Sequence, residues 1–436
     1  MWRSPVEFDM SRGFAPISSI FWGEEMVVSS AEELVEAAAN PAVKTITVTI
    51  GLSEVPGIRL APGVALRGLR KLRPALRFAP GVDGVRLSTN NAVADLDLFA
   101  SDDHCAIYND ESVNSLGRLT IHCVNATGRV QILARGNVRH GHVVVEGLDI
   151  ISADSRGEME RPHQYGVDVM QGAFTLWNLQ NDSSTVITAD VLDLSAGRFG
   201  APVLGSGIFV SGAGEAGGRV EVQHLRTGPI YSDGRIESGT AGLISGGVFV
   251  VYGARADLVE NIGPVTTYGP NDMALDNWGI VDRWMSREKV TTFGPSGVGF
   301  VNFGTIGKLL VEAPIETFGR GARGFNVYTG TVRTAEFDRI VTHADGAVGV
   351  QISQPVGTLL IRRGIETFGE VGDSLVKGVV MKLPATALSI KAGGSVESMR
   401  IEGGLRTHGK DVLALEQHGT IASLHIEGGF SSVLSA

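Results

Sequence analysis

The chain has 436 residues, of which 43% are hydrophobic and 58 are glycine, and its formal net charge is −10. A nucleic-acid-binding protein needs a basic stripe that neutralises phosphates, and so acidic a chain disfavours one. The sequence also lacks the polybasic run that attaches a protein to an anionic membrane surface. We therefore expect neither nucleic acid nor membrane among its partners.

The first 25 residues do not have the pattern of a secretory signal. Arg3, Glu7, Asp9 and Arg12 interrupt the apolar residues there, whereas a signal needs a continuous hydrophobic region. No apolar run reaches the roughly eighteen residues that a membrane-spanning helix requires. The sequence predicts a soluble, cytoplasmic protein, although a chain that begins after a removed signal would look the same.

Residues 29–40, SSAEELVEAAAN, predict a short helix. Ser29 or Ser30 can cap its first turn, and Leu34 and Ala38 form an apolar stripe at i, i+4 spacing. A helix of this kind suits the open end of a solenoid, where it covers an otherwise exposed core. We expect residues 1–44 to form an N-terminal arm and capping helix.

The two cysteines each follow a histidine, as His104-Cys105 and His122-Cys123. Histidine and cysteine are zinc ligands, so a metal site deserves consideration. Neighbouring residues of a strand point to opposite faces, however, so each pair would offer a single ligand to a common site. We expect buried free thiols, no metal and no cofactor.

A short phrase recurs in the second half of the chain, and its threonines are 25 residues apart except at the last step, which is 40. A step of 40 indicates either a coil enlarged by a loop or a coil that skips the phrase. The phrases are VTTYG at Val265, VTTFG at Val290, IETFG at Ile315, IVTHA at Ile340, IETFG at Ile365 and LRTHG at Leu405.

A second phrase, a small residue followed by apolar-x-apolar, recurs between these threonines. Apolar residues alternate within it, which is the periodicity of a strand with one buried face. The residues predicted to point inward are Val167, Ile208, Val248, Leu275, Phe300, Phe325, Val350 and Val379. Two phrases at constant separation predict at least two strands in each coil. We therefore expect an all-β fold, a right-handed parallel β-helix with coils of about 25 residues over 45–430 in a single domain over 1–436.

Residues 32–69 begin with EELVEAAAN and end with the turn LAPGVALRGL. This passage resembles the start of the pectin-lyase-like right-handed β-helix superfamily: a capping helix, a first strand and a turn of this type. The resemblance implies a protein that acts on carbohydrate. Polygalacturonase-like catalytic motifs are matched only by Asp102-Asp103 and by the reversed His140-Gly141-His142, so no catalytic residue is carried over.

The residues between the inward positions are expected to face solvent, with aromatic side chains two residues further along the chain. Aromatic rings beside carboxylates and amides can bind a saccharide, because rings stack on apolar sugar faces while polar groups bond the hydroxyls. Coverage by a second subunit or by a folded-back loop is the alternative. The expected outward residues are Asp168, Phe209, Phe249, Asp276, Val301, Asn326 and Gln351, with the aromatics Trp278, Phe303 and Tyr328.

Residues 270–284 hold the densest group of acids and indoles, with Asp272 and Asp276 beside Trp278. Paired carboxylates can divide the roles of acid and base, or acid and nucleophile, at separations of roughly 5 to 10 Å. Aspartates at corners also stabilise turns, which is the structural alternative. We expect Asp276, with Asp272, to be the leading catalytic candidate.

Two predicted loops could form walls beside these residues, because insertions in solenoids cluster on the binding side. The loops span residues 152–166 and 226–240. The loops supply the candidate substrate-binding residues Arg161, His163 and Tyr231 and the catalytic candidates Asp233 and Glu237. The outward column supplies Asp168 as a further catalytic candidate.

Two sets of like residues are assigned to structure. Asn277 and Asn302 share one inward column, where their amides can bond along the stack. The corner residues that follow the threonines form the second set, because a ladder of like side chains at a turn is usually packing. They are Tyr268, Phe293, Phe318, His343, Phe368 and His408.

The sequence thus predicts a carbohydrate-active enzyme, a hydrolase, lyase or intramolecular transferase, that acts on an oligosaccharide. A non-catalytic glycan-binding or scaffold solenoid and a surface passenger domain are the alternatives. Because many apolar residues are expected on the outer face, we also predict a homo-oligomer, a trimer or a dimer.

Overall fold

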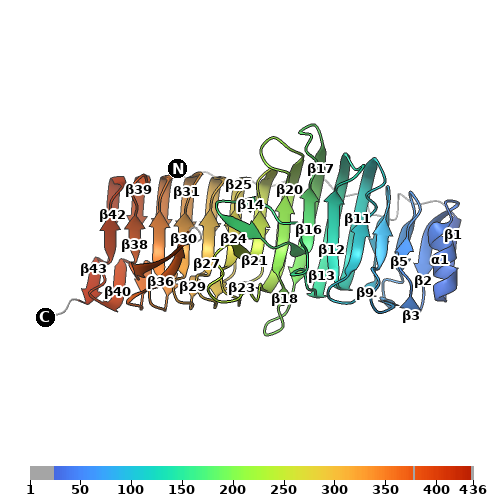
Figure 1. Cartoon of the computed structure of the whole chain (residues 1–436), viewed down its shortest axis with the longest axis horizontal. Helices are drawn as coiled ribbons and strands as arrows, with labels where there is room; N and C mark the ends of the chain where they lie inside the picture. Colours follow the sequence, from blue (N-terminus) through green and yellow to red (C-terminus); the bar gives the residue numbers. More distant parts are fainter. Residues whose placement is uncertain (1–23, 377–378, 434–436) are drawn as a thin grey trace, which may run out of the picture.

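The computed structural model describes residues 24–376 and 379–433, which form a right-handed parallel β-helix with one helix near the N-terminal end. Its coils stack along one long axis, and each runs through a 26-stranded sheet and a 15-stranded sheet (Figure 1). The predicted fold class is confirmed. In the part of the chain that the structure describes, no helix is long and apolar enough to cross a membrane.

The 26-stranded sheet bends around the solenoid, so that most coils contribute two short strands or one long strand to it. Its strands are β1 (Glu24–Val28), β2 (Val43–Val48), β3 (Leu52–Val55), β5 (Ala65–Gly68), β6 (Ala75–Phe78), β8 (Ala92–Ala94), β9 (Asp97–Phe99), β11 (Ser115–Thr127), β13 (His140–Ser152), β17 (Val186–Ala196), β18 (Val203–Leu204), β20 (Arg219–Asp233), β22 (Ala254–Asn261), β23 (Val265–Thr267), β25 (Ile280–Ser286), β26 (Val290–Thr292), β28 (Thr305–Val311), β29 (Ile315–Thr317), β31 (Thr331–Phe337), β32 (Ile340–Thr342), β34 (Pro355–Ile361), β35 (Ile365–Thr367), β39 (Ser395–Ile401), β40 (Leu405–Lys410), β42 (Thr420–Ile426) and β43 (Phe430–Val433).

The 15-stranded sheet forms the opposite wall. Its main path is β4 (Ile58–Arg59), β7 (Val85–Leu87), β10 (Cys105–Asn109), β12 (Arg129–Ala134), β16 (Gly172–Asn178), β19 (Ser206–Ser211), β21 (Leu243–Val250), β24 (Asp272–Asn277), β27 (Val298–Asn302), β30 (Arg323–Val327), β33 (Val348–Ile352), β38 (Leu388–Ile390) and β41 (Leu415–Gln417). Two short strands off this path, β14 (His163–Gln164) and β15 (Val167–Val169), pair with each other.

The predicted helix is present as α1, Ala31–Ala39, and Ser30 is its N-cap. The Ser30 hydroxyl accepts a hydrogen bond from the Glu33 amide at 3.2 Å, while the Glu33 carboxylate accepts one from the Ser29 amide at 2.7 Å. The arrangement is a variant of the capping box, because the Glu33 carboxylate bonds the residue before the N-cap and not the N-cap Ser30 itself. Leu34 is buried by the first coils. Of the arm expected before this helix, residues 24–28 form β1, which pairs with β2, while residues 1–23 lie outside the described residues.

The repeat phrases stack as predicted. Thr267, Thr292, Thr317, Thr342, Thr367 and Thr407 are successive partners in parallel register. The inward column from Ile208 to Val350 is also continuous, and its members are completely buried in the core. Each regular coil holds three strands, such as β24, β25 and β26. The repeat spacing therefore gave the correct register for this half of the molecule.

The predicted ladders are confirmed. The Asn277 amide donates to the Asn302 side-chain oxygen at 2.8 Å inside the solenoid. The corner rings from Tyr268 to His408 stack at centroid distances between 4.4 and 5.5 Å, with interplanar angles of 16° or less. Both sets hold neighbouring coils in register.

The prediction of an inward position is wrong for two residues, Val167 and Val379. Val167 belongs to β15, which pairs with the beginning of β21 and with β14, not with the next coil. Val379 belongs to β37 (Val379–Pro384), which forms an antiparallel hairpin with β36 (Val371–Val376). Leu388 of β38 takes the place expected for Val379. The 40-residue step is thus a coil enlarged by an insertion that contains this hairpin.

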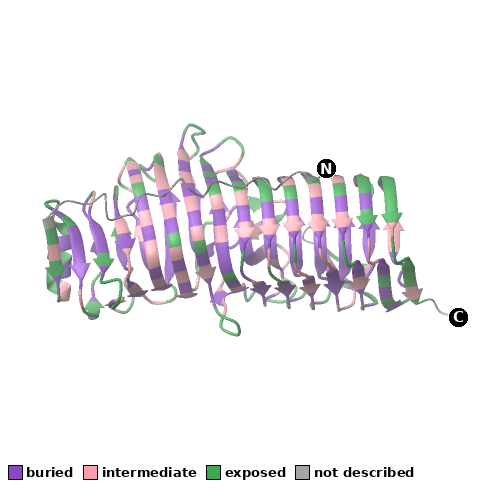
Figure 2. Cartoon of the chain, turned by 180° about the vertical axis from the view of Figure 1, so that it is seen from behind, coloured by how far each residue is buried: buried purple, intermediate pink, exposed green. Residues whose placement is uncertain are grey.

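The two sheets differ in burial. Strands β28, β31 and β34 of the 26-stranded sheet alternate buried with more exposed residues, and this face is visible in Figure 2. Every residue of β27, β30 and β33 in the 15-stranded sheet is buried. A strand buried on both faces must be covered from outside the solenoid as well as from within. The cover is the starting point for the candidate site.

Candidate functional site

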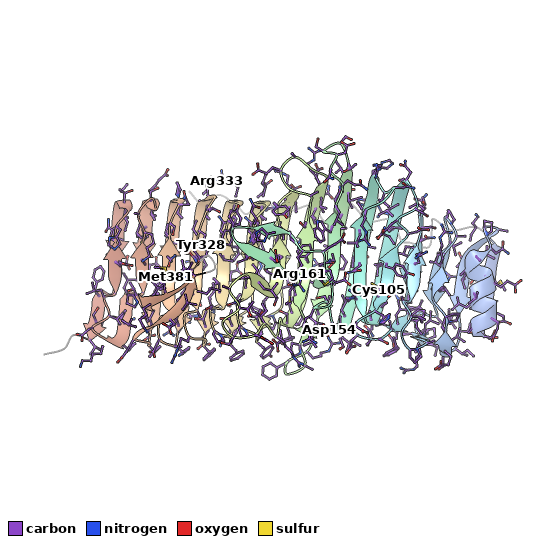
Figure 3. All side chains as sticks on the ribbon, in the orientation of Figure 1. Cys105, Asp154, Arg161, Tyr328, Arg333 and Met381 are labelled. Atoms are coloured by element: carbon purple, nitrogen blue, oxygen red, sulfur yellow. The ribbon has the colours of Figure 1, made fainter. Side chains whose placement is uncertain are left out.

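Two hairpins cover the outer face of the 15-stranded sheet (Figure 1). The first is β14–β15, which is joined to the stack through Asp168↔Leu243 and Val169↔Ile244. The second is β36–β37. In Figure 3, Tyr328 lies along the axis between Arg161 of the first insertion and Met381 of the second hairpin. The two insertions thus reach the same face from opposite ends.

Tyr165 forms the tip of the first hairpin. Its ring stacks on Phe303 at 4.6 Å with an interplanar angle of 20°, and meets the Trp278 ring edge-on at 5.1 Å. Both turn residues have positive φ, 54° for Tyr165 and 83° for Gly166. Asparagine, aspartate and glycine are favoured at such positions, whereas a large side chain is strained. We therefore attribute the tyrosine in this strained turn to the contacts of its ring with Phe303 and Trp278.

The second hairpin is tied to the sheet by polar contacts. The Leu375 carbonyl accepts a hydrogen bond from the Arg323 guanidinium at 3.2 Å, and the Leu375 amide donates to the Ser296 hydroxyl at 3.3 Å. Ser374 donates to the Gly321 carbonyl at 2.8 Å. These bonds hold β36 over the coils that carry β27 and β30.

A cavity of about 40 Å³ remains between the two hairpins. It is large enough for a few waters but too small for a sugar ring. Ligand entry would therefore require a hairpin to move. The lining residues are Tyr165, Val167, Ile244, Met273, Asp276, Ser296, Val298, Val301, Phe303, Arg323, Tyr328 and Leu375.

Asp276 points outward, as predicted, but the hairpins bury it completely. Neither of its carboxylate oxygens has a hydrogen-bond partner of ordinary geometry. Burial raises the pKa of Asp276 well above its usual value, because desolvation penalises the charged form, and the Trp278 indole opposes this only in part. Burial thus favours the neutral, protonated form of Asp276 over the charged form.

Arg323 is the second buried polar group of the cavity and is 1% exposed. One guanidinium nitrogen, Nη1, donates to backbone carbonyls, while Nε and Nη2 have no hydrogen-bond partner. The guanidinium carbon lies over the Tyr328 ring, 5.9 Å from its centroid. A buried N–H without a hydrogen-bond partner costs about 1–3 kcal/mol in stability. Among the described residues, no carboxylate forms an ion pair with Arg323. The two free nitrogens of a guanidinium form a fork that matches a carboxylate.

The outward column of Asp276 passes through Val301 in the next coil and then reaches two further polar residues. Asn326 and Gln351 share its register, and both are buried. Neither side-chain atom of the Asn326 amide has a hydrogen-bond partner, nor has the Gln351 carbonyl. Four polar side chains on one covered face therefore have unused hydrogen-bonding capacity.

Trp278 and Tyr328 are only 4% and 8% exposed, so the expectation of an open aromatic surface is wrong. Phe303 stacks on Tyr328 at 5.1 Å. Coverage by a folded-back loop was the alternative interpretation, and the β14–β15 hairpin provides it. The apolar columns that suggested an oligomer are thus covered by the chain itself, and the oligomeric state stays a prediction.

Asp272 is not a partner for Asp276. It lies at a coil corner, where its carboxylate accepts hydrogen bonds from Ser245 at 2.5 Å and from the Gly269 amide at 2.7 Å. Burial raises the pKa of Asp272 to about 7, and the neighbouring Asp233 adds to the rise. These contacts stabilise the turn, which agrees with the structural alternative for aspartates at corners.

The remaining candidates lie away from the cavity. Asp168 is paired with His163 on the outside of the first hairpin at 2.6 Å. The Arg161 guanidinium donates to the carbonyls of Glu158 and Arg156 within its own loop.

The second predicted loop is mostly strand, because β20 continues to Asp233. Tyr231 packs edge-on against Phe199 at 6.2 Å, and Glu237 is exposed. The Asp233 carboxylate accepts a hydrogen bond from the Arg235 amide at 2.8 Å. None of these residues lines the cavity.

A larger hollow of about 370 Å³ lies on the 26-stranded sheet. It forms where a bulge begins, since Ala189 pairs with Val222 but Asp190 pairs with His224. Several of its polar groups already have partners, such as His142 with Thr188 at 2.8 Å and Arg255 with Asp282 at 2.6 Å. Unpaired buried groups distinguish the smaller cavity, so we regard that cavity as the better candidate.

Sequence reasoning missed Arg323, and it placed Tyr165 in the 152–166 loop beside the expected site without a role for its ring. Arg323 shares its column with Met273, Val298 and Val348, so a charge at an otherwise apolar position was a usable signal. Tyr165 stands beside Gly166 in a predicted loop, where no sequence pattern indicated a hairpin. Comparison with protein-family models, with curated proteins and with solved structures gives no significant match.

Proposed function

We propose that the protein binds an acidic saccharide, one that carries a carboxylate, in the cavity between the two hairpins. The observation that carries this proposal is the buried Arg323 guanidinium with two unpaired nitrogens. A ligand carboxylate would occupy this fork, while the Phe303–Tyr328 stack offers a surface for an apolar sugar face.

Tyr165 supports a lid function for the first hairpin. Its ring occupies the place on Phe303 where a sugar ring would stack. Replacement of the Tyr165 ring by a sugar ring would preserve most of the contact with Phe303. The turn that holds Tyr165 is strained, which lowers the cost of moving it. Displacement of this hairpin would enlarge a cavity that is otherwise too small.

The second candidate is a carbohydrate-active enzyme with Asp276 as general acid. A carboxyl group kept neutral by an apolar site is suited to donate a proton. Asp276 is the one carboxylate among the described residues that line the cavity, whereas most glycoside hydrolases need two. The geometry therefore favours binding, or a cleavage that uses one acid.

The test is a thermal-shift screen of uronic-acid oligosaccharides and their neutral counterparts. Wild type should be stabilised by one or more acidic saccharides, and Arg323→Met should lose at least tenfold in affinity. Arg333→Met is the matched control, because Arg333 is exposed and lies apart from Tyr328 in Figure 3. Equal affinity for the acidic and neutral members of a pair would overturn the proposal.

Turnover tests the second candidate. Any cleavage found in the same screen should fall by roughly 10² to 10⁴ in Asp276→Asn, because the amide cannot transfer a proton. A rate within threefold of wild type would remove Asp276 from the reaction.

A further inference from the structure

Asp95, His122 and Cys123 come together at a corner of the 26-stranded sheet, on coils remote in sequence from the cavity. Asp95 lies between β8 and β9, and the other two lie in β11 of the next coil. One carboxylate oxygen, one ring nitrogen and the sulfur all lie within 4.8 Å of one another. The His122 Nε2 atom is 3.3 Å from the Cys123 sulfur.

The expectation that His122 and Cys123 point to opposite faces is therefore wrong. Cys123 has φ of 52°, so the strand is not extended there. The same corner has positive φ in four successive coils, at Asp95, Cys123, Gly147 and Asp193. Glycine, asparagine and aspartate are the residues that tolerate this conformation.

A cysteine at this corner carries conformational strain, which the aspartate and glycine of the neighbouring coils largely avoid. Strained positions of this kind cost on the order of 1–3 kcal/mol and cluster at functional sites. The left-handed backbone of Cys123 turns its sulfur toward His122 and Asp95. The positive φ is therefore a second observation at this corner, beside the ligand-atom distances.

Glu146 supplies the next shell of contacts. It is the register partner of His122 in β13, and its carboxylate lies 3.3 Å from the His122 Nδ1 atom. Histidines that bind a metal through one ring nitrogen commonly bond a carboxylate through the other. The His122 Nδ1 atom lies near the Glu146 carboxylate without a hydrogen bond of ordinary geometry, and Nε2 lies beside the Cys123 sulfur.

We propose that Asp95, His122 and Cys123 bind a zinc ion, with Glu146 orienting the histidine. One sulfur, one nitrogen and one oxygen ligand suit zinc, and three protein ligands leave a fourth position for water or a small ligand. The carboxylate and the thiolate together balance the two charges of the ion. This proposal does not depend on the saccharide site.

Cys105 provides the matched control. It is also preceded by a histidine, but its sulfur donates to Gln131 at 3.3 Å and His104 bonds Asp103 instead. The two His-Cys pairs therefore have the same sequence and different surroundings.

The experiment is titration of the metal-free full chain with Co²⁺, followed by competition with Zn²⁺. Wild type and Cys105→Ser should bind one equivalent, with the tetrahedral bands and the sulfur-to-cobalt charge-transfer band of a thiolate ligand. Cys123→Ser should lose the charge-transfer band, and Zn²⁺ should displace the cobalt. Glu146→Gln should weaken binding by 10- to 100-fold.

The variant Asp95→Asn removes one proposed ligand with little risk of misfolding, because asparagine tolerates positive φ. It should keep the wild-type circular dichroism and thermal midpoint without metal, while its Co²⁺ affinity falls at least tenfold. Failure of wild type to bind Co²⁺ at micromolar concentration would overturn the proposal. Loss of the charge-transfer band in Cys105→Ser, or its retention in Cys123→Ser, would do the same.

Discussion

Residues 254–361 and residues 85–233 build the same solenoid in different ways. In the later region the repeat is regular, since the register partners Leu275, Phe300, Phe325 and Val350 are each 25 residues apart, and like side chains recur at one position. In the earlier region coil lengths vary, as the in-register series Ile107, Val130, Phe174 and Ile208 shows. Strands there reach 15 residues. Regular coils provide ladders, whereas irregular coils provide the bulge, the strained corner and the first hairpin.

The difference shows how chemistry enters a repeat protein. A regular coil is constrained by identical neighbours above and below it, so a new polar group must fit two copies of one environment. Coils of unequal length lack this constraint. The candidate cavity combines both, because regular coils supply Asp276 and Arg323 while insertions supply the cover.

The largest expected effect is a difference in the free energy of unfolding lost when an inward or a corner aromatic residue of the regular region is replaced. Phe325 is fully buried and packs on Phe300 and Phe337, so Phe325→Ala should cost about 3–5 kcal/mol. Phe318 stacks in the corner ladder but is 38% exposed, so Phe318→Ala should cost much less. Urea unfolding followed by circular dichroism measures both. Equal costs would show that the ladder is as important as the core.

The second prediction concerns the corner acid Asp272. Its pKa of about 7 lies above the unfolded value of 3.8, so the folded state holds a proton that the unfolded chain releases between these values. Stability should fall by up to about 4 kcal/mol as pH rises from 4 to 7, and change little above 7 from this cause. Asp272→Asn should flatten the slope, whereas exposed Asp257→Asn should not. Parallel slopes in all three proteins would contradict the buried-acid account.

A third prediction tests whether the asparagine ladder is locally replaceable. The same column holds Val327 and Ile352 in the next coils. Asn277→Val or Asn302→Val alone should cost about 1–3 kcal/mol, because the partner amide loses its bond in the core. The double variant should recover most of that loss, as a double-mutant cycle would show. Additive losses would mean that the backbone contacts of each asparagine matter more than the pair.

The smallest expected effect distinguishes two halves of the threonine column. The Thr342 hydroxyl donates to the Ala347 carbonyl at 2.8 Å, whereas the buried Thr317 hydroxyl has no hydrogen-bond partner. Thr342→Val should cost about 1 kcal/mol, while Thr317→Val should be neutral or stabilising. Thermal midpoints of the two variants give the comparison. The reverse order would show that Thr317 has a partner, such as water.

The sequence could predict the stack because strand periodicity and coil length are both local patterns. Leu275, Phe300 and Phe325 were placed inward correctly for this reason. Val167 and Val379 show the same local alternation, yet they lie in hairpins outside the stack. Periodicity identifies a strand with a buried face, but it does not say whether that strand belongs to a coil or crosses over one.

The candidate site was predictable in composition but not in arrangement. Asp276, Asn326 and Trp278 were placed on the outer face, whereas their burial depends on chain that arrives from residues 165 and 375. Cys123 was misjudged because its left-handed backbone is set by the corner. Such tertiary context overrides the alternation on which the strand argument rests.

The central claim is that the hairpins cover a ligand-binding cavity and not merely an additional core. A crystal structure of the chain with an oligogalacturonate tests it most directly. The account predicts a ligand carboxylate on the Arg323 guanidinium, a sugar ring against Phe303, and Tyr165 displaced from it. A ligand bound in the open hollow beside Asp190, with both hairpins unmoved, would contradict the account.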